Sequence, residues 1–301
     1  MNNQSIDSLK GLAIIGVVIC HIAFVNKLDH KTIDEIYTLQ YIFSWCVMGF
    51  FFCSGYLEKQ WNGEFLAWSI KKIKRLLIPL FIFELTYKLI LMLSSNLYSQ
   101  NLDIDWNQFL SYSAPQTYYL FVLFILFVAL KLINYIVRFE SGSLFFLVFL
   151  VLLFSESPNI AYGNDILLYP YYLLCMLSGV IVRSKEECFS SMIAVLFCFA
   201  VALFAGTDVL VFTFVPMFVY AVFKIISPAE IMRPLKALGK YSSSIYIWHT
   251  PIILPFFLMI ALPFLGKGWF TVITSSILTL ILCIAIKRIT SKYFLFKMWD
   301  F

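Results

Sequence analysis

Long apolar runs, separated by short polar segments, repeat along the whole chain. Each run approaches the length of about 20 residues that a helix needs to cross a bilayer. The runs predict membrane spans at 9–25, 38–58, 76–95, 118–137, 143–156, 165–183, 189–206, 208–226, 244–265 and 270–290. The fifth run is short and the seventh and eighth are nearly continuous, so the count ranges from about nine to about eleven. We expect an all-α polytopic membrane protein, with about ten transmembrane helices in one bundle and a single domain over residues 1–301.

The composition agrees with this prediction. The chain of 301 residues is 61% hydrophobic and only 13% charged, whereas an ordinary soluble domain is about 25% charged. Too few polar residues are present to cover a water-exposed surface. Any chemistry must therefore use residues within or beside the membrane.

The sequence shows no pattern typical of a metal or nucleotide-hydrolysis site. Its seven cysteines form no CxxC pair and lie mostly in apolar runs, where small packing residues are expected. A phosphate-binding GxxxxGK[ST] loop is absent. We expect no metal site, no tightly bound cofactor and no nucleic-acid partner.

Loops rich in Lys and Arg alternate along the chain with loops that are poor in them. Lys and Arg gather at 71–75, 131–138, 183–185, 224–240 and 287–297, and the segment 94–117 has none. Because cytoplasmic loops of membrane proteins carry the excess of Lys and Arg, this alternation predicts a multi-pass protein of the cell (inner or plasma) membrane with both termini in the cytoplasm.

Two ionisable residues lie on one face of the first predicted span. Lys10 and His21 are eleven residues apart, which on a helix is about 16 Å of rise and only about 20° of rotation. An ionisable residue deep in the membrane is costly and points to function, and His exchanges protons near neutral pH. The alternative is a neutral His21 that bonds a neighbouring helix, with Lys10 as an interfacial anchor.

Two further sequence elements lie at the end of the second predicted span and just before the third. Ser54 and Gly55 interrupt the aromatic end of the second span, either as a packing notch or as a place where a ligand approaches closely. A run of four cations follows between Lys71 and Arg75, and it includes Lys72, Lys74 and Arg75. They are either positive-inside charges that contact lipid headgroups or a clamp for a phosphorylated ligand.

Glu84 and His249 are secondary candidates. Glu84 lies inside the third span and would orient a His, receive a proton, or pair with Lys88 at i+4. His249 precedes Thr250 and Pro251 in an apolar span, so it is either a proton-exchanging group or a satisfied His at a helix kink.

Taken in order, these stretches resemble acyltransferase family 3, the membrane acyltransferases of bacterial surface polysaccharides. SIDSLKGLAIIGVVICH resembles its first-helix signature, in which Arg usually stands where this chain has Lys10. FFCSGYLE resembles its F-x-x-S-G-[FY]-L element. The other similar segments are KKIKRLLIP, TYYLFVLFILF, YPYYLLCMLSGVIV and LGKYSSSIYIWHTPI. Lys keeps the charge at position 10 but loses the planar guanidinium fork.

The resemblance implies a mechanism. Cytoplasmic acyl-CoA, most simply acetyl-CoA, would be the co-substrate and would dock its phosphates on the cation run. Its arm would pass Lys10, Ser54 and Gly55, and His21 would act at the thioester, either as general base or as carrier of the acyl group. The acceptor would be a hydroxyl of a lipid-linked, cell-surface or exported glycan. Membrane lipids are the remaining expected partner.

Two other functions fit the same residues. A proton-coupled transporter or flippase of glycan precursors would use intramembrane His and Glu as a proton relay, although no pair of broken half-helices indicates an inverted repeat. A structural subunit of a glycan-export complex would tolerate the loss of His21. Binding of a CoA ester by the purified protein separates the enzyme from the transporter.

Overall fold

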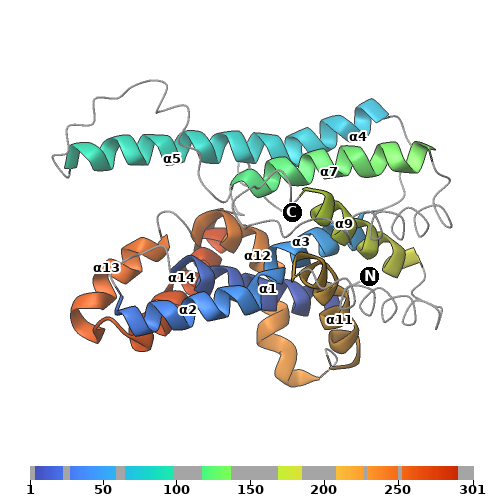
Figure 1. Cartoon of the computed structure of the whole chain (residues 1–301). Helices are drawn as coiled ribbons and strands as arrows, with labels where there is room; N and C mark the ends of the chain where they lie inside the picture. The colour runs from blue at the N-terminus through green and yellow to red at the C-terminus, as the bar shows by residue number, and fades with distance from the viewer. Residues whose placement is uncertain are drawn as a thin grey trace. The chain divides into compact units, whose positions relative to one another are not determined.

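The computed structural model describes residues 4–22, 28–58, 65–97, 117–136, 169–184, 208–226, 229–249 and 253–290, and the regular structure within them is helical throughout. The elements are α1 (Gln4–Ile22), α2 (His30–Phe43), α3 (Trp45–Leu57), α4 (Phe65–Lys72), the π-helical turn η1 (Ile73–Leu77), α5 (Ile78–Leu97), α7 (Thr117–Ile136), α9 (Tyr169–Ser184), α11 (Asp208–Ile226), the 3₁₀ turn η3 (Glu230–Met232), α12 (Arg233–Trp248), α13 (Leu254–Leu265) and α14 (Trp269–Thr290) (Figure 1).

The helices confirm the all-α membrane class. Three of those described are long and apolar enough to cross a membrane, namely Gln4–Ile22, His30–Leu57 and Trp269–Ile289. The spans expected at 143–156 and 189–206 lie outside the described residues, and every other predicted span overlaps a described helix. The count of about ten spans stays a prediction.

The boundaries differ from the prediction in two places. The second span was expected from residue 38, but its helix begins at His30 because the side chain of Asp29 caps it, accepting hydrogen bonds from the Thr32 backbone N–H and hydroxyl. A local break at Ser44 separates α2 from α3. The ninth predicted span, 244–265, is represented by two helices, α12 and α13, with residues 250–252 outside the described part.

Contacts group the chain into two compact units. Unit 1 comprises Met1–Gln60 and Leu126–Ser242, and unit 2 comprises Trp61–Ile125 and Ser243–Phe301. The expectation of a single domain over residues 1–301 stays a prediction.

In unit 1, α3 is packed against α1, α9 and α11. A Cβ atom built on Gly55 of α3 would lie 1.9 Å from the Met176 carbonyl oxygen of α9, and one on Gly179 of α9 would lie 2.1 Å from the Phe52 carbonyl oxygen of α3. The two backbones therefore touch, as small residues permit between membrane helices. Beside this contact, the Phe51 ring stacks on Tyr172 with centroids 4.5 Å apart.

In unit 2, α14 returns alongside α13 after a tight turn (Figure 1). The turn contains Gly266, whose φ of 76° is a conformation that other L-residues rarely adopt. Two aromatic pairs join further elements of this unit. Phe83 of α5 lies edge-on to Trp248 at 5.9 Å, and Tyr119 of α7 packs on Tyr246 at 5.0 Å.

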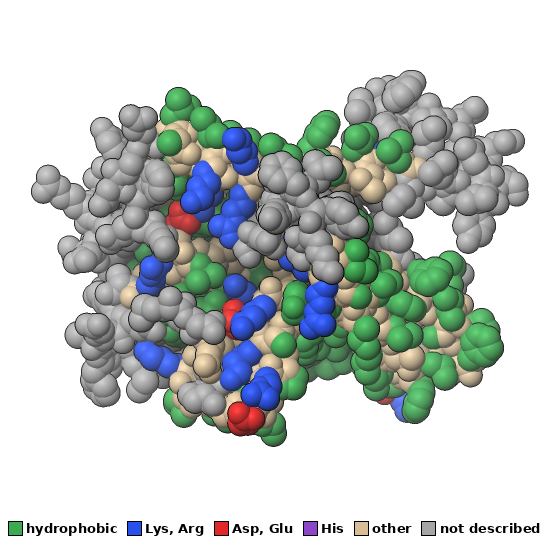
Figure 2. Space-filling view, turned by 180° about the vertical axis from the view of Figure 1, so that it is seen from behind, with side chains coloured by type: hydrophobic (Ala, Val, Ile, Leu, Met, Phe, Trp, Pro, Cys, Tyr) green, Lys and Arg blue, Asp and Glu red, His purple; other side chains and the backbone are tan. Residues whose placement is uncertain are grey.

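The surface of α14 is arranged as expected for a helix in lipid. Large apolar side chains such as Phe270, Ile277 and Ile281 are exposed, whereas hydroxyl side chains on the same helix are buried. Wide hydrophobic areas with clusters of Lys and Arg are visible on the surface in Figure 2. Because lipid does not reward the burial of apolar groups, a membrane protein exposes them without loss.

Candidate functional site

Lys10 and His21 lie on one unbroken helix. Both belong to α1, and both side chains are half-buried. The regular helix over Gln4–Ile22 preserves the spacing inferred from the sequence, about 16 Å along the axis with about 20° between the two side chains. The pair therefore offers a charge six residues into α1 and an imidazole at its last turn, on the same face.

The imidazole of His21 is oriented by its own helix. Its Nδ1 lies 2.7 Å from the Val17 carbonyl oxygen. Because a carbonyl oxygen can only accept a hydrogen bond, Nδ1 is the protonated nitrogen, and in the neutral ring the lone pair is on Nε2. The residue before His21 is bonded to a neighbouring helix, since the Gln40 side-chain amide of α2 donates to the Cys20 carbonyl oxygen at 2.6 Å. His21 is thus fixed in the tautomer that a base acting through Nε2 requires.

Lys10 lies among groups that the sequence analysis did not identify. The half-buried carboxylate of Asp7, one turn earlier, interacts electrostatically with Lys10 and with Lys240 of α12. Lys10 and Asp7 both act on the buried thiol of Cys53 in α3. The structure therefore places Lys10 within electrostatic reach of Cys53, the residue that precedes Ser54 and Gly55. The i,i+3 spacing of Asp7 and Lys10 was visible in the sequence, but the approach of Lys240 was not.

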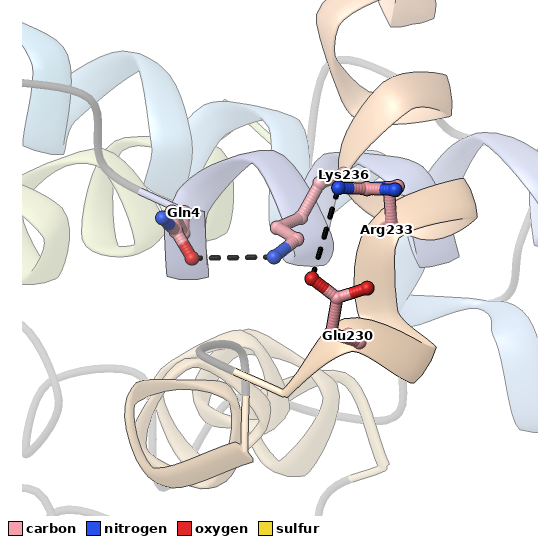
Figure 3. A network of polar contacts seen from close by, with 4 residues as sticks. All are labelled: Gln4, Glu230, Arg233 and Lys236. Carbon is pink, nitrogen blue, oxygen red and sulfur yellow. Dashed lines mark hydrogen bonds and ion pairs between the residues drawn. The ribbon is translucent and has the colours of Figure 1, made fainter.

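Close packing of α1 on α12 fixes this cluster. A Cβ atom on Gly239 would lie 1.7 Å from the Asp7 carbonyl oxygen, and one on Gly11 would lie 2.1 Å from the Leu235 carbonyl oxygen. Polar contacts continue along the same junction. The Lys236 ammonium donates to the Gln4 side-chain oxygen at 3.2 Å (Figure 3). The backbones of α1 and α12 therefore touch at Asp7, and small residues at Gly11 and Gly239 permit this approach.

The Gly55 element is used for packing. The Ser54 hydroxyl donates to the Phe50 carbonyl oxygen of its own helix at 2.8 Å, and Gly55 faces α9. The end of α3 is held by Arg183 of α9, whose Nη1 donates to the Tyr56 and Glu58 carbonyl oxygens at 3.2 and 2.8 Å. Contact of Ser54 and Gly55 with an acyl-CoA stays a prediction.

The cation run lies on α4 and the π-helical turn that follows. Lys74 and Arg75 are exposed, whereas Lys72 is 9% exposed, with its ammonium 5.7 Å from the centre of the Trp68 ring. A cation over an indole face is stabilised electrostatically. π-Helical turns occur often at functional sites. The run thus presents three exposed cations, Lys71, Lys74 and Arg75, beside one that is packed on an aromatic ring.

The secondary candidates belong to unit 2. His249 is fully buried, and its Nδ1 lies 3.0 and 2.9 Å from the Ile245 and Tyr246 carbonyl oxygens, which assigns the proton of the neutral ring to Nδ1. Glu84 is half-buried on α5. The packing of Phe83 on Trp248 joins the segments that carry these two residues.

The predicted residues thus divide between the two units. Lys10, His21, Ser54 and Gly55 belong to unit 1, and the remaining candidates, Lys72, Lys74, Arg75, Glu84 and His249, belong to unit 2. Within the described part of the chain, no group of three or more His, Cys, Asp and Glu side chains is arranged to hold a metal ion.

Comparison with known proteins gives one match. The family model described as "Acyltransferase domain", that of acyltransferase family 3, matches residues 3–288. No curated protein and no solved structure matches the chain. The match covers α1 with Lys10 and His21 and every other candidate residue, up to the last turn of α14. This protein belongs to acyltransferase family 3, and it is a membrane acyltransferase.

Proposed function

We propose that the protein transfers an acyl group, most simply acetyl, from cytoplasmic acyl-CoA to a hydroxyl of a cell-surface or exported glycan, with the chemistry at His21. The observation that carries the proposal is the bond from Nδ1 of His21 to the Val17 carbonyl oxygen. It leaves the lone pair of the neutral ring on Nε2, the nitrogen that would accept a proton. The family match supports acyl transfer as the reaction class.

In the general-base route, Nε2 of His21 takes the proton of the acceptor hydroxyl as its oxygen attacks the thioester carbonyl carbon. The carbon–sulfur bond then breaks, and the proton passes from Nε2 to the departing sulfur, giving CoA thiol and the O-acyl product. In the alternative route, Nε2 attacks the thioester carbonyl carbon, the carbon–sulfur bond breaks, and CoA departs as thiolate. The acceptor hydroxyl then attacks the acyl group on Nε2, the bond to Nε2 breaks, and the hydroxyl proton passes to the thiolate, giving the same two products. Both routes need Nε2 unprotonated, and both begin from the same tautomer.

The cations would bind and orient the donor. In this proposal Lys74 and Arg75 contact the phosphates of CoA, and Lys72 adds a third charge from its place over Trp68. Lys10 lies about 16 Å from His21 along α1, so it would hold the donor as the arm passes toward His21, and Asp7 would hold the Lys10 ammonium in position. Lys provides a point charge here, without the bidentate geometry of Arg.

The test is transfer of labelled acetyl groups from acetyl-CoA to a surface-glycan fraction by membranes that contain the protein. We compare the native protein with His21→Ala at matched expression. Loss of a general base slows a reaction by about 10²- to 10⁴-fold, so label incorporation should fall to background. His30→Ala is the matched control, because His30 is exposed at the start of α2.

The outcomes separate the competing functions. Incorporation that needs His21 but not His30 supports the enzyme and its base. Unchanged incorporation in His21→Ala would remove His21 from the mechanism and direct attention to His249 and Glu84. No incorporation with native protein, together with no binding of a CoA ester, would favour the transporter reading.

A further inference from the structure

The turn between α11 and α12 exposes two isoleucines. Ile225, in the last turn of α11, is 79% exposed, and Ile231, in the 3₁₀ turn η3, is 84% exposed. A backbone hydrogen bond from the Ala229 N–H to the Ile226 carbonyl oxygen, at 3.0 Å, joins the end of α11 to the segment that carries η3. One tight turn of unit 1 thus carries a large exposed apolar side chain on each of its two arms.

A cation accompanies each of these isoleucines. Lys224 directly precedes Ile225 and is exposed. Arg233 follows Ile231 by two residues, and its guanidinium is 3.7 Å from the Glu230 carboxylate (Figure 3). Both members of that pair are exposed, and an exposed ion pair contributes little stability, so Arg233 can exchange Glu230 for another anion. We call Lys224, Ile225, Ile231 and Arg233 together the α11–α12 turn surface.

The positive charge continues along α12. Lys236 and Lys240 follow Arg233 at i+3 and i+7, a spacing that lies on one side of a helix. Lys240 is exposed, and Lys236 is half-buried where its ammonium reaches α1. Over the described residues between 224 and 240, four basic side chains stand against one acid, Glu230. The surface therefore complements an anion.

The headgroup layer of a membrane suits both kinds of side chain. Cations exposed to the hydrocarbon core would be costly, and isoleucines exposed to water would gain nothing from burial. At the boundary, apolar side chains reach the acyl chains while cations stay beside the lipid phosphates. The sequence predicts residues 224–240 on the cytoplasmic side, where the leaflet is negatively charged. Charge complementarity thus favours a phospholipid of net negative charge over a zwitterionic one.

We propose that the α11–α12 turn surface binds anionic phospholipid, with Lys224 and Arg233 at the lipid phosphate and Ile225 and Ile231 among the first carbons of the acyl chains. The inference goes beyond acyl transfer and does not depend on it. The contact would anchor the start of α12, the helix whose backbone touches α1 at Asp7, at the membrane surface.

The test is photocrosslinking of the full chain in vesicles of equal parts phosphatidylcholine and phosphatidylglycerol, with a photoreactive benzophenone amino acid in place of Ile231. Mass spectrometry identifies the lipid that is attached. One basic residue beside anionic lipid contributes about 1 kcal/mol, a factor of about 5, so phosphatidylglycerol adducts should exceed phosphatidylcholine adducts at least about 5-fold. The excess should vanish when Lys224→Gln and Arg233→Gln are combined, and shrink in high salt. Lys267→Gln, which removes an exposed cation between α13 and α14, is the control and should leave the excess unchanged.

Other results would overturn the inference. Equal adducts of the two lipids would show that the contact is apolar only, and an absence of lipid adducts would show that the turn lies in water. A crosslink to protein would show that protein covers this surface. An excess that persists in the double variant would assign the anionic lipid to other cations. The charge-keeping variants Lys224→Arg and Arg233→Lys should retain the excess, and its loss there would indicate that the two side chains serve the fold.

Discussion

Replacing Gly55 with Ala should separate α3 from α9. The new Cβ atom would lie 1.9 Å from the Met176 carbonyl oxygen and 2.7 Å from its carbonyl carbon. Ordinary contact begins at 3.4 Å, so the helices must move apart by about 1.5 Å at this point. The obstacle is backbone, which has no rotamer to change, and the stacked pair Phe51–Tyr172 lies on the same interface.

The cost follows from two opposed terms. Overpacking a well-packed core costs about 1–3 kcal/mol, and a backbone obstacle places this site at the upper end, about 3 kcal/mol. Ala recovers about 1 kcal/mol through its better helix propensity. The net loss is about 2 kcal/mol, which for a chain of this size corresponds to a melting temperature lower by roughly 5 °C.

The assay is thermal unfolding of purified protein in detergent, followed by tryptophan fluorescence. Gly49→Ala on the same helix is the control, because its nearest neighbour would be a Trp45 ring atom at 3.3 Å, which can yield slightly. We expect Gly49→Ala to melt within about 2 °C of the native protein. Equal melting temperatures for Gly55→Ala and Gly49→Ala would refute the claim that α3 and α9 touch through their backbones.

Three further changes test other contacts. Hydrogen bonds from the Thr32 backbone N–H, and then from its hydroxyl, hold the pKa of Asp29 below its ordinary value, so the cap stabilises α2 above the ordinary pKa and this stabilisation is lost as pH falls through the lowered pKa. The melting temperature of the native protein should therefore exceed that of Asp29→Asn by less at pH 3 than at pH 7. A difference that does not change with pH would contradict this. Arg183→Ala removes the side chain that donates to the carbonyl oxygens of Tyr56 and Glu58 at the end of α3. The free energy of unfolding, measured by denaturant titration, should fall by about 1 kcal/mol, and an unchanged midpoint would contradict this contribution. Tyr220→Phe keeps the ring and loses the 3.1 Å hydroxyl contact with Tyr56, again worth about 1 kcal/mol, and full native stability would show that this contact contributes nothing.

The features that sequence predicted well are those set by local periodicity. The same-face relation of Lys10 and His21 needs only a regular helix, and α11 matches the predicted span 208–226 at both ends. The late start predicted for the second span was wrong, because hydropathy does not register the capping of α2 by Asp29.

The features that sequence could not predict depend on contacts between distant segments. The interaction of Asp7 with Lys240 arises where α1 crosses α12. Arg183 reaches carbonyl oxygens 125 and 127 residues earlier in the chain.

The central claim is that Lys10 and His21, on one face of α1, serve acyl transfer together. The most direct measurement is the initial rate of labelled acetyl transfer from acetyl-CoA to the glycan acceptor by purified protein in vesicles. We predict that His21→Ala lowers the rate by 10²-fold or more, and that Lys10→Gln lowers it by about 10-fold at limiting acetyl-CoA, the loss expected for one charged hydrogen bond to the donor, whereas Lys10→Arg, which keeps the charge, retains most of it. Native rates in His21→Ala, or equal rates in Lys10→Gln and Lys10→Arg, would contradict the account.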